Sequence, residues 1–289
     1  MDAILLAALG GVFFGALAVA QRIGLARDPD AEAAAVISCV GGLAVALVVT
    51  AAVGDAGQLL RTDIWPFLVA GLIAPGISQV FFVYAVRMIG AARSSTLIAA
   101  APLMAAVPAF LILDEPFRPA LPVGAVLIVS GAILLAGEPT LPTGYRHLGI
   151  LLALISAGLI AARDNLVRAY AREGHVSGLT AATVSFTAAS LLLLVFLGAL
   201  RGRRAMHSLS LAVRPFFPAG ILLGLAYCAN LEALTRGRVT VVDPFYGTEA
   251  LWALLFAYLV LGRSERIGAR VLATAALMVT GAALIGAFR

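Results

Sequence analysis

The sequence predicts an all-α integral membrane protein with ten transmembrane helices, arranged as two inverted five-helix repeats around a central cavity. Composition is the first reason: 62% of the 289 residues are hydrophobic, only 12% are charged, and mean hydropathy is +1.04. A soluble domain carries about twice that share of charged residues. A chain this apolar is expected to have lipid as its main solvent.

The second reason is an internal repeat with an offset of 148 residues. At this offset residues 99–102 align with 247–250, and residues 109–113 align with 257–261. A period of this length is half a protein, because solenoid units are about 20–50 residues long. Five spans per copy is an odd number, so the second copy would enter the membrane from the opposite side. Inverted repeats of this kind support alternating access.

Apolar runs of about 20 residues, the length that crosses hydrocarbon, give the expected spans. In the first repeat, residues 1–138, they are 3–24, 33–53, 67–88, 94–113 and 121–137. A linker is expected at 139–147. In the second repeat, residues 148–289, the spans are 148–170, 177–200, 216–235, 243–261 and 268–288, with a basic loop at 201–214. Pro75, Pro102 and Pro108 are expected to kink their helices.

Short motifs at matching places in both halves carry a family resemblance. In the first half they are Tyr84-Ala85, Gly90-Ala91-Ala92, Ser94-Ser95, Pro102, Leu113-Asp114-Glu115 and Gly131. In the second half they are Glu232-Ala233, Val239-Thr240, Gly247-Thr248-Glu249, Leu261-Gly262 and Gly281. The chain resembles the drug/metabolite transporter superfamily, in its EamA-type ten-helix exporters. The Glu-Pro step of that family is split here, since Pro102 has no glutamate and Glu249 has no proline.

The resemblance implies a secondary-active or facilitative transporter that exports small metabolites, with amino acids as the leading class. It also implies a central cavity among spans one, three, four, six, eight and nine. A proton-coupled cation antiporter is the alternative, with Glu249 as a proton site, although span one lacks the glutamate expected of small multidrug antiporters. A sugar-phosphate translocator is less favoured, because the arginines lie near the predicted span ends.

Polar and aromatic residues inside the spans are the candidate substrate-binding residues, because a polar side chain facing lipid costs a few kcal/mol. Glu249 is the one carboxylate well clear of a predicted span end, and helical spacing places it on a stripe with Phe245, Trp252 and Phe256. Such a stripe suits an ammonium group and an aromatic substrate. Packing and helix–helix hydrogen bonds are the alternative explanation. The candidates are Phe14, Gln21, Gln79, Phe82, Ser95, Tyr227, Asn230, Tyr246, Glu249 and Trp252.

Charged residues near the predicted span ends form a second set. Arg163 and Asp164 are expected to form an interfacial salt bridge, with a gate or a substrate-carboxylate anchor as the alternative. Asp164 and Arg168 are spaced i,i+4, as are Glu232 and Arg236, so each couple can pair on one helix face. Asp243, which precedes Pro244, is expected to cap the start of span nine.

Several function classes lack their sequence signatures. No G-x-S-x-G, H-E-x-x-H or P-loop motif is present, so neither an enzyme nor a metal or other cofactor site is predicted, with an intramembrane enzyme as the non-transporter alternative. The absence of lysine excludes Schiff-base cofactors. The basic residues, at a pI near 9.8, are expected to meet anionic lipid headgroups and not nucleic acid.

The expected partners are therefore a small-molecule substrate and the lipid bilayer, and one monomer is sufficient because both halves of the cavity come from one chain. The alanine-rich composition, with arginine as the only strongly basic residue, fits a bacterial inner membrane. The two sides of the membrane would carry 12 and 8 arginines. The positive-inside rule then places both termini outside, whereas the family resemblance places both in the cytoplasm, and the second placement is the one we expect.

Overall fold

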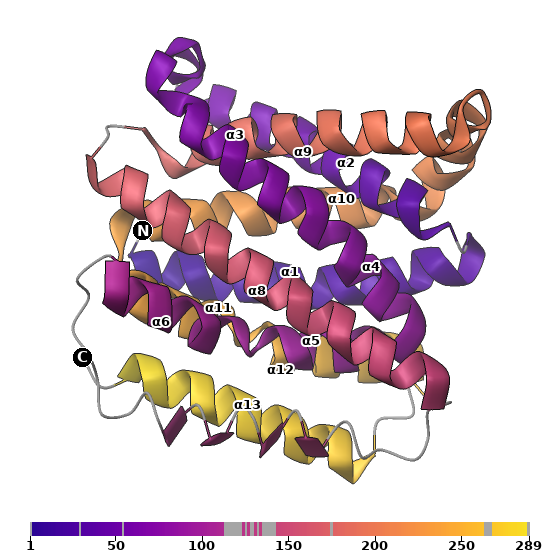
Figure 1. Ribbon diagram of the computed structural model, residues 1–289, viewed down its shortest axis with the longest axis vertical. Coiled ribbons are helices and arrows are strands. Elements are labelled where there is room, and N and C mark those ends of the chain that lie inside the picture. The colour runs from indigo at the N-terminus through magenta and orange to yellow at the C-terminus, as the bar shows by residue number, and fades with distance from the viewer. Residues whose placement is uncertain are drawn as a thin grey trace.

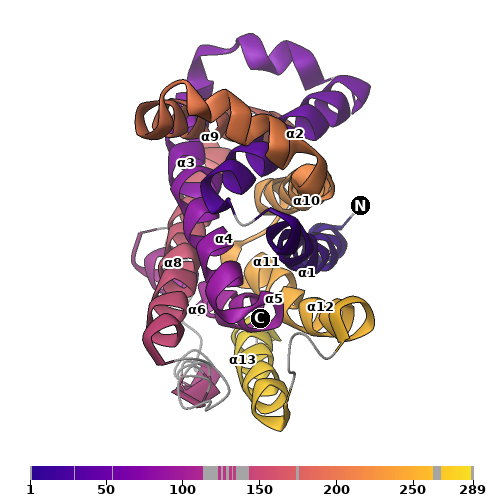
Figure 2. The same cartoon turned by 90° about the vertical axis from the view of Figure 1, so that its right-hand side faces the viewer.

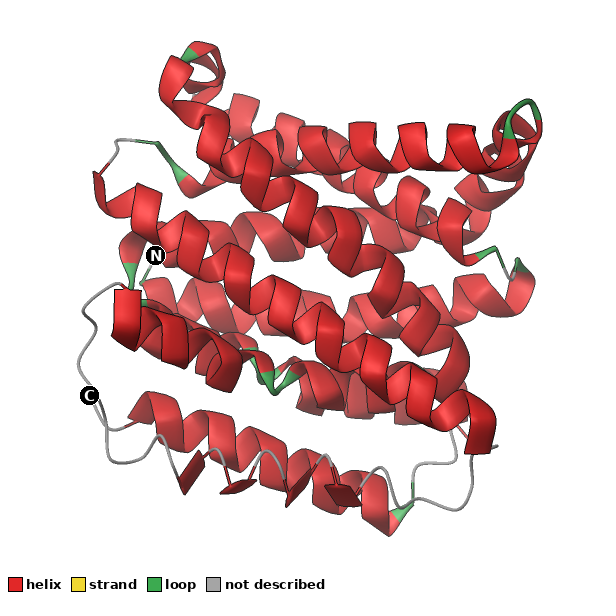
Figure 3. Cartoon of the chain, viewed as in Figure 1, coloured by secondary structure: helices red, strands yellow, loops and turns green. Residues whose placement is uncertain are grey.

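The computed structural model describes residues 2–28, 30–53, 55–112, 143–173, 176–262 and 268–287, together with positions 123–124, 126–127, 130–131 and 133–134. Throughout these residues the regular structure is helical, as Figure 3 shows. The motif Leu113-Asp114-Glu115 and most of the predicted fifth span lie outside the described residues.

The first half begins with two long helices, α1 (Ala3–Arg27) and α2 (Ala31–Val53), followed by short turns of 3₁₀ helix, η1 (Asp55–Leu60) and η2 (Thr62–Ile64). The third span is one path made of α3 (Trp65–Gly71), the π-helical η3 (Leu72–Ile77) and α4 (Ser78–Ile89). Ala74 has extended backbone angles, φ −146° and ψ 123°, which confirms the kink predicted at Pro75. The next span consists of α5 (Ala91–Ile98) and α6 (Ala101–Ile112).

The second half contains α8 (Thr143–Glu173), α9 (Gly178–Arg201) and α10 (Arg204–Arg236). A broken span follows, made of α11 (Val239–Tyr246), α12 (Glu249–Phe256) and η4 (Ala257–Leu261), and the last helix is α13 (Ala269–Ala287). The predicted basic loop at 201–214 is wrong, because α10 begins at Arg204 and includes both Pro215 and Pro218. Helix α8 likewise begins at Thr143, inside the predicted linker.

Eight helical segments of the described chain are long and apolar enough to cross a membrane. They contain 22–33 residues each, and Ala269–Gly281 adds a shorter apolar helix. This confirms the all-helical membrane class within the described residues. The count of ten spans and the inverted relation between the halves stay predictions.

Each half packs its first long helix against the other half. Helix α1 contacts α10, α11 and α12, whereas α8 contacts α4, α5 and α6. Figure 2 shows α1 between α10 and α12, with α2 and α9 on one side of the bundle and α13 on the other. Helices α2, α9 and α10 contact one another and run side by side in Figure 1. The space between the halves is therefore bounded by α1, α4, α8 and the broken spans.

The two broken spans interrupt their hydrogen bonding at matching places. Helix α5 ends before Ala99-Ala100 and α11 ends before Gly247-Thr248, an offset of 148. In each break the i→i−4 bond of the α-helix gives way to an i→i−3 bond: the Ala100 amide donates to the Leu97 carbonyl at 3.1 Å, and the Thr248 amide donates to the Phe245 carbonyl at 3.3 Å. The breaks face each other, because α5 contacts α12 and α6 contacts α11. The sequence repeat thus coincides with a repeat of local backbone structure.

Glycine permits the close approach of α2 and α10. A Cβ atom added to Gly41 would lie 2.9 Å from the Cα atom of Gly220, closer than ordinary van der Waals contact. Small residues allow transmembrane helices to approach in this way, which increases their packing in lipid.

We expect Gly41→Leu to lower the free energy of unfolding by about 1–3 kcal/mol or more, because the larger side chain overpacks this contact. The measurement is the apparent midpoint of thermal unfolding in detergent. Gly198→Leu is the matched control, since Gly198 lies on α9 with no atom within 4 Å of an added Cβ. Equal midpoints for the two variants would contradict the packing described here.

Candidate functional site

A small closed cavity lies between the halves. Its lining combines residues from α1, α4, α5, α8, α10, α11 and α12, all of them buried. The volume is about 10 Å³, near the lower limit for one ordered water molecule. The structure is thus closed around this site. The lining residues are Phe14, Ser78, Gln79, Phe82, Ile98, Ser156, Ile160, Tyr227, Tyr246 and Glu249.

Six of these residues are among the ten sequence candidates, namely Phe14, Gln79, Phe82, Tyr227, Tyr246 and Glu249. Sequence reasoning missed four: Ser78, Ile98, Ser156 and Ile160. Two of these had a detectable signal. Ser156, Ile160 and Arg163 follow one another at i, i+4 and i+7, so they share one face of α8. The Ser156 hydroxyl donates to the Ser78 carbonyl at 3.0 Å, which joins α8 to α4 at the cavity wall.

Aromatic rings form one wall of the cavity. The Phe14 ring meets Tyr246 edge-on, with ring centroids 4.6 Å apart, and lies 5.5 Å from the Tyr227 ring. Phe186 supports Tyr227 from behind at 5.0 Å. Such edge-to-face and tilted pairs are favourable beyond the area that they bury. The faces of these rings make a wall that accepts apolar groups and cations.

Glu249 is the acidic group of the cavity. It is 2% exposed and is the first residue of α12. A helix N-terminus favours negative charge, because its first amide groups point toward it. Among the described residues no hydrogen bond or ion pair reaches the Glu249 carboxylate. The residue is therefore available to bind a positively charged group.

Arg163 and Asp164 lie in the interior of the bundle, so their predicted interfacial position is wrong. The two side chains are 0% and 1% exposed, with Arg163 Nε 3.1 Å from Asp164 Oδ1. The Arg163 guanidinium also lies over the Tyr227 ring, 4.6 Å from its centroid. Helix α8 continues to Glu173 and packs against α10, which removes this pair from the membrane surface. The pair therefore lies one turn along α8 from the cavity residue Ile160.

The surroundings of this ion pair are unusually rich in unsatisfied polar atoms. None of the three Arg163 nitrogens makes a hydrogen bond of regular geometry, and the same is true of both Asp164 oxygens. Asn230 interacts with Asp164 electrostatically without completing a regular hydrogen bond, and Asp243 also acts on Arg163. The Tyr246 hydroxyl has no partner either. Buried polar atoms are rarely left unsatisfied, so this cluster is suited to receive water or a polar ligand.

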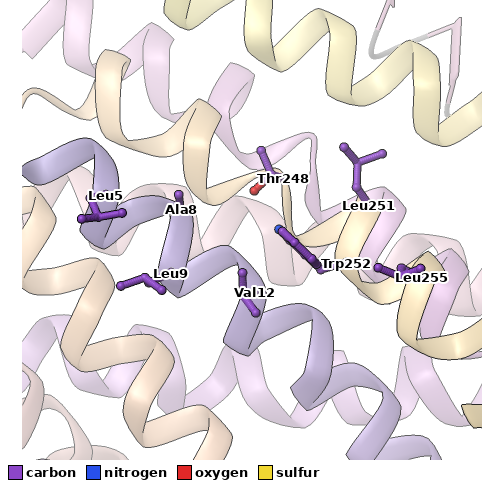
Figure 4. A pocket seen from close by; sticks show the side chains of 8 residues that line it. All are labelled: Leu5, Ala8, Leu9, Val12, Thr248, Leu251, Trp252 and Leu255. Carbon is purple, nitrogen blue, oxygen red and sulfur yellow. The ribbon is translucent and has the colours of Figure 1, made fainter. Parts of the chain in front are cut away.

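The remaining predicted cavity residues lie elsewhere. The Gln21 amide donates to Ser38 at 3.1 Å and so joins α1 to α2. Ser95 is fully buried in α5 and is not among the residues that line the cavity, although Ile98 on the next turn is. Trp252 lies in a groove on the outer side of α12, as Figure 4 shows, and stacks on Phe256 at 6.0 Å. The predicted stripe is therefore divided, because the break at Gly247-Thr248 separates Phe245 from Glu249.

Asp243 does not cap a helix start, contrary to the prediction. Helix α11 begins four residues earlier at Val239, with Arg238 in the capping position. Asp243 is instead a buried residue within α11, and its carbonyl accepts from Gly247. Pro244 removes one helical hydrogen bond without ending α11. Membrane helices tolerate proline where neighbouring groups or local adjustment satisfy the freed carbonyl.

A first polar cluster, defined as Asp30, Glu32, Tyr84 and Arg201, lies where α9 ends. Arg201 at the end of α9 pairs with Asp30 and, at 2.9 Å, with Glu32 at the start of α2. Glu32 also accepts a hydrogen bond from Tyr84 on α4. These contacts join α2 and α4 of the first half to α9 of the second.

Asp30 is the titratable group of this cluster that lies outside the spans. Burial would raise its pKa, but the Ala33 amide and the Arg201 guanidinium outweigh burial and hold the pKa below the ordinary 3.8. Because the pKa is lower in the folded protein, Asp30 adds stability above about pH 3.8, and this is lost as the pH falls through the folded value. The pair with Arg201 is thus fully formed at neutral pH.

A second polar cluster, defined as Gln58, Ser177, Leu179, Glu232 and Arg236, lies at the other end of α9, where that helix begins. The Leu179 amide at the start of α9 donates to Glu232 at 3.3 Å, and the Ser177 amide donates to Gln58 at 2.8 Å. Glu232 also pairs with Arg236 at 2.5 Å, as predicted from their spacing. Glu232 is 148 residues after Tyr84, so both clusters use the same repeat position.

Arg168 also joins α8 to α10, since its Nη1 atom donates to the Leu234 carbonyl at 3.2 Å. The described ion pair of Asp164 is made with the adjacent Arg163. Within the described chain no group of three or more His, Cys, Asp or Glu side chains could hold a metal ion.

Comparisons with known proteins agree with this fold. A family model described as the EamA-like transporter family matches residues 1–137 and 147–287. A solved structure titled only "Crystal structure of protein" is similar to this chain, with 21% sequence identity and a TM-score of 0.66. The similar region includes 98% of this chain and 94% of the chain in that structure. That likeness concerns the fold alone. The search of curated proteins gives no match.

The chain belongs to the EamA-like transporter family, because the family model covers nearly its whole length. The family implies a multi-pass membrane transporter of small molecules. The closed cavity between the halves is the candidate site of that transport.

We expect Arg163→Met to destabilise the folded protein by about 3–5 kcal/mol, because it leaves the Asp164 carboxylate buried without its cation. The double variant Arg163→Met/Asp164→Leu should recover most of this loss, since it removes both charges. The apparent midpoint of thermal unfolding in detergent measures both. A double variant no more stable than the single one would show that the two charges are not coupled.

Proposed function

We propose that the protein exports small metabolites that carry both an ammonium group and a carboxylate, with amino acids as the leading class. The single observation that carries this proposal is the closed cavity in which Glu249 faces an aromatic wall. Arg163 lies one turn along α8 from the lining residue Ile160, on the same face of that helix. We take the substrate class also from the paired motifs of the two halves, in which the chain resembles amino-acid exporters such as YddG.

The chemistry of the lining supports this choice. A substrate ammonium group would pair with Glu249 and lie against the rings of Tyr246 and Phe14. A substrate carboxylate would receive hydrogen bonds from the planar guanidinium of Arg163, whose donors match carboxylate geometry. The substrate carboxylate would compete with the Asp164 carboxylate for the guanidinium of Arg163. An apolar or aromatic side chain of the substrate would be placed among the remaining lining residues, which include Phe82, Ile98 and Ile160.

Transport would proceed by alternating access of two inverted halves. The matching breaks of the two broken spans support this mechanism, and so does the packing of α1 and α8 each against the opposite half. The cavity volume of about 10 Å³ is too small for an amino acid, so binding requires one end to open. The two polar clusters are the contacts that would have to break, one at a time.

A second candidate function follows from the buried charges. Among the described residues three carboxyl groups are buried, those of Asp164, Asp243 and Glu249, against two guanidinium groups, those of Arg93 and Arg163. This excess of acidic groups favours a substrate with a positive charge, which keeps the proton-coupled cation antiporter as the alternative. It disfavours a sugar-phosphate substrate, because Asp164 already neutralises Arg163 despite the interior position of that arginine.

The proposed setting is a bacterial inner membrane with both termini in the cytoplasm. One chain supplies every wall of the cavity, which supports a monomer as the transporting unit.

We expect purified protein in proteoliposomes to exchange labelled amino acids in a counterflow assay. Glu249→Gln should reduce the exchange about tenfold or more, because a charge-assisted contact of about 1.5–3 kcal/mol is lost. Asp63→Asn is the matched control, since Asp63 is exposed and pairs with Arg61 away from the cavity.

Exchange of organic cations without exchange of amino acids would select the antiporter alternative. Amino-acid exchange that is unchanged in Glu249→Gln would remove the ammonium-binding role of Glu249 but leave the substrate class.

We expect a covalent link across the first polar cluster to stop transport. In a variant with Cys39 and Cys228 replaced by alanine, cysteines at Asp30 and Arg201 would be joined by a short bifunctional thiosulfonate. Exchange should fall to background and return after reduction, because this end can no longer open. Cysteines at Arg61 and Asp63 are the control, since that ion pair lies within one segment. Full exchange by the cross-linked Asp30/Arg201 variant would contradict the gating role.

A further inference from the structure

A groove separate from the cavity runs along the outer side of α1 and α12 (Figure 4). Its volume is about 510 Å³, far larger than that of the cavity. Its walls come from one face of α1 and from the first two turns of α12. They include Leu5, Ala8, Leu9 and Val12 on α1, and Thr248 and Trp252 on the α12 side.

The chemistry of the groove selects an apolar occupant. Thr248 supplies the one hydroxyl group in its lining, and this hydroxyl already donates to the Phe245 carbonyl at 2.7 Å. The rims are open leucine side chains, since Leu5 is 51% and Leu251 46% exposed. Both helices belong to segments long and apolar enough to span the membrane. The groove therefore opens to the hydrocarbon of the bilayer, where acyl chains are the available ligand.

The groove also has a length and an end that suit one phospholipid chain. From Leu5 to Val12, the α1 wall of the groove covers about 10 Å at roughly 1.5 Å per residue. One leaflet holds roughly 15 Å of hydrocarbon, so the groove can hold most of one acyl chain. At the outer end, a Cβ on Gly237 would lie 3.1 Å from the Ala3 side chain. The next residue, Arg238, is exposed. An arginine at this level attracts a lipid phosphate.

We propose that this groove binds one acyl chain of a membrane phospholipid from the leaflet in which α1 begins, with Arg238 near its phosphate. The bound chain lies directly behind the residue that carries the cavity carboxylate. Thr248 faces the groove and Glu249 faces the cavity. Gly15 seals the seam between them, because a Cβ there would be 2.5 Å from Trp252 Cβ and 2.9 Å from the Glu249 carbonyl oxygen. The lipid chain thus supports α12 in its place against α1.

The test uses Trp252 as the reporter of its own groove. Trp65→Phe leaves Trp252 as the only tryptophan, and the delipidated protein in detergent is titrated with phosphatidylglycerol brominated in its acyl chains. We expect quenching of Trp252 that saturates at one lipid per protein. Ala8→Phe, which fills the groove, should remove most of the quenching. Arg238→Gln should raise the lipid concentration needed for half-maximal quenching several-fold and leave the final quenching unchanged.

Val195→Phe is the control, because Val195 is a lipid-facing residue on α9, 70% exposed and outside the groove. In this control the brominated lipid should quench Trp252 as strongly as it does in the Trp65→Phe parent. Quenching that rises without saturation, or that is equal in Ala8→Phe and the parent, would overturn the proposal by showing ordinary contact with lipid. Because the readout is lipid binding, the result is independent of which substrate the protein transports.

Discussion

The structure depends on one constraint, which is that charged and polar side chains within lipid-spanning helices must be enclosed by the bundle. Facing lipid, each would cost several kcal/mol. Glu249, Asp164, Asp243 and Arg163 are all nearly inaccessible to solvent and lipid, although the chain is overwhelmingly apolar. All four lie on helices of the second half, α8, α11 and α12. Helices of the first half complete their enclosure, because α8 packs against α4 and α5, and both α11 and α12 pack against α1. The charges therefore gather where the halves meet.

Close helix packing is what makes this enclosure possible. Glycines on α1 and α2 allow the backbones of α12 and α10 to approach closely, so few gaps remain beside the charged groups. Irregular backbone is confined to the interior in the same way. The breaks before α6 and α12 lie inside the bundle, where neighbouring helices and not lipid surround their carbonyl groups.

Sequence reasoning predicted the helical membrane class, the kink at Pro75 and six of the cavity residues. Composition and periodicity suffice for these, because they depend on local chemistry. They did not predict the depth of Arg163, since a charge in the last turns of a span is interior or interfacial according to which helices cover it. They also placed Trp252 and Glu249 on one face. That reading did not include α1, whose Gly15 packs against α12 between the groove that Trp252 lines and the cavity that Glu249 lines.

The central claim is that one buried site between the halves opens at one end at a time. Reactivity of a cysteine at Ser156, in protein with Cys39 and Cys228 replaced by alanine, tests it most directly, because this position lines the cavity. A membrane-impermeant thiol reagent would be applied from each side of oriented vesicles. The account predicts that Arg201→Gln allows labelling from one side only and Glu232→Gln from the other side only. Labelling from the same side in both variants would contradict it.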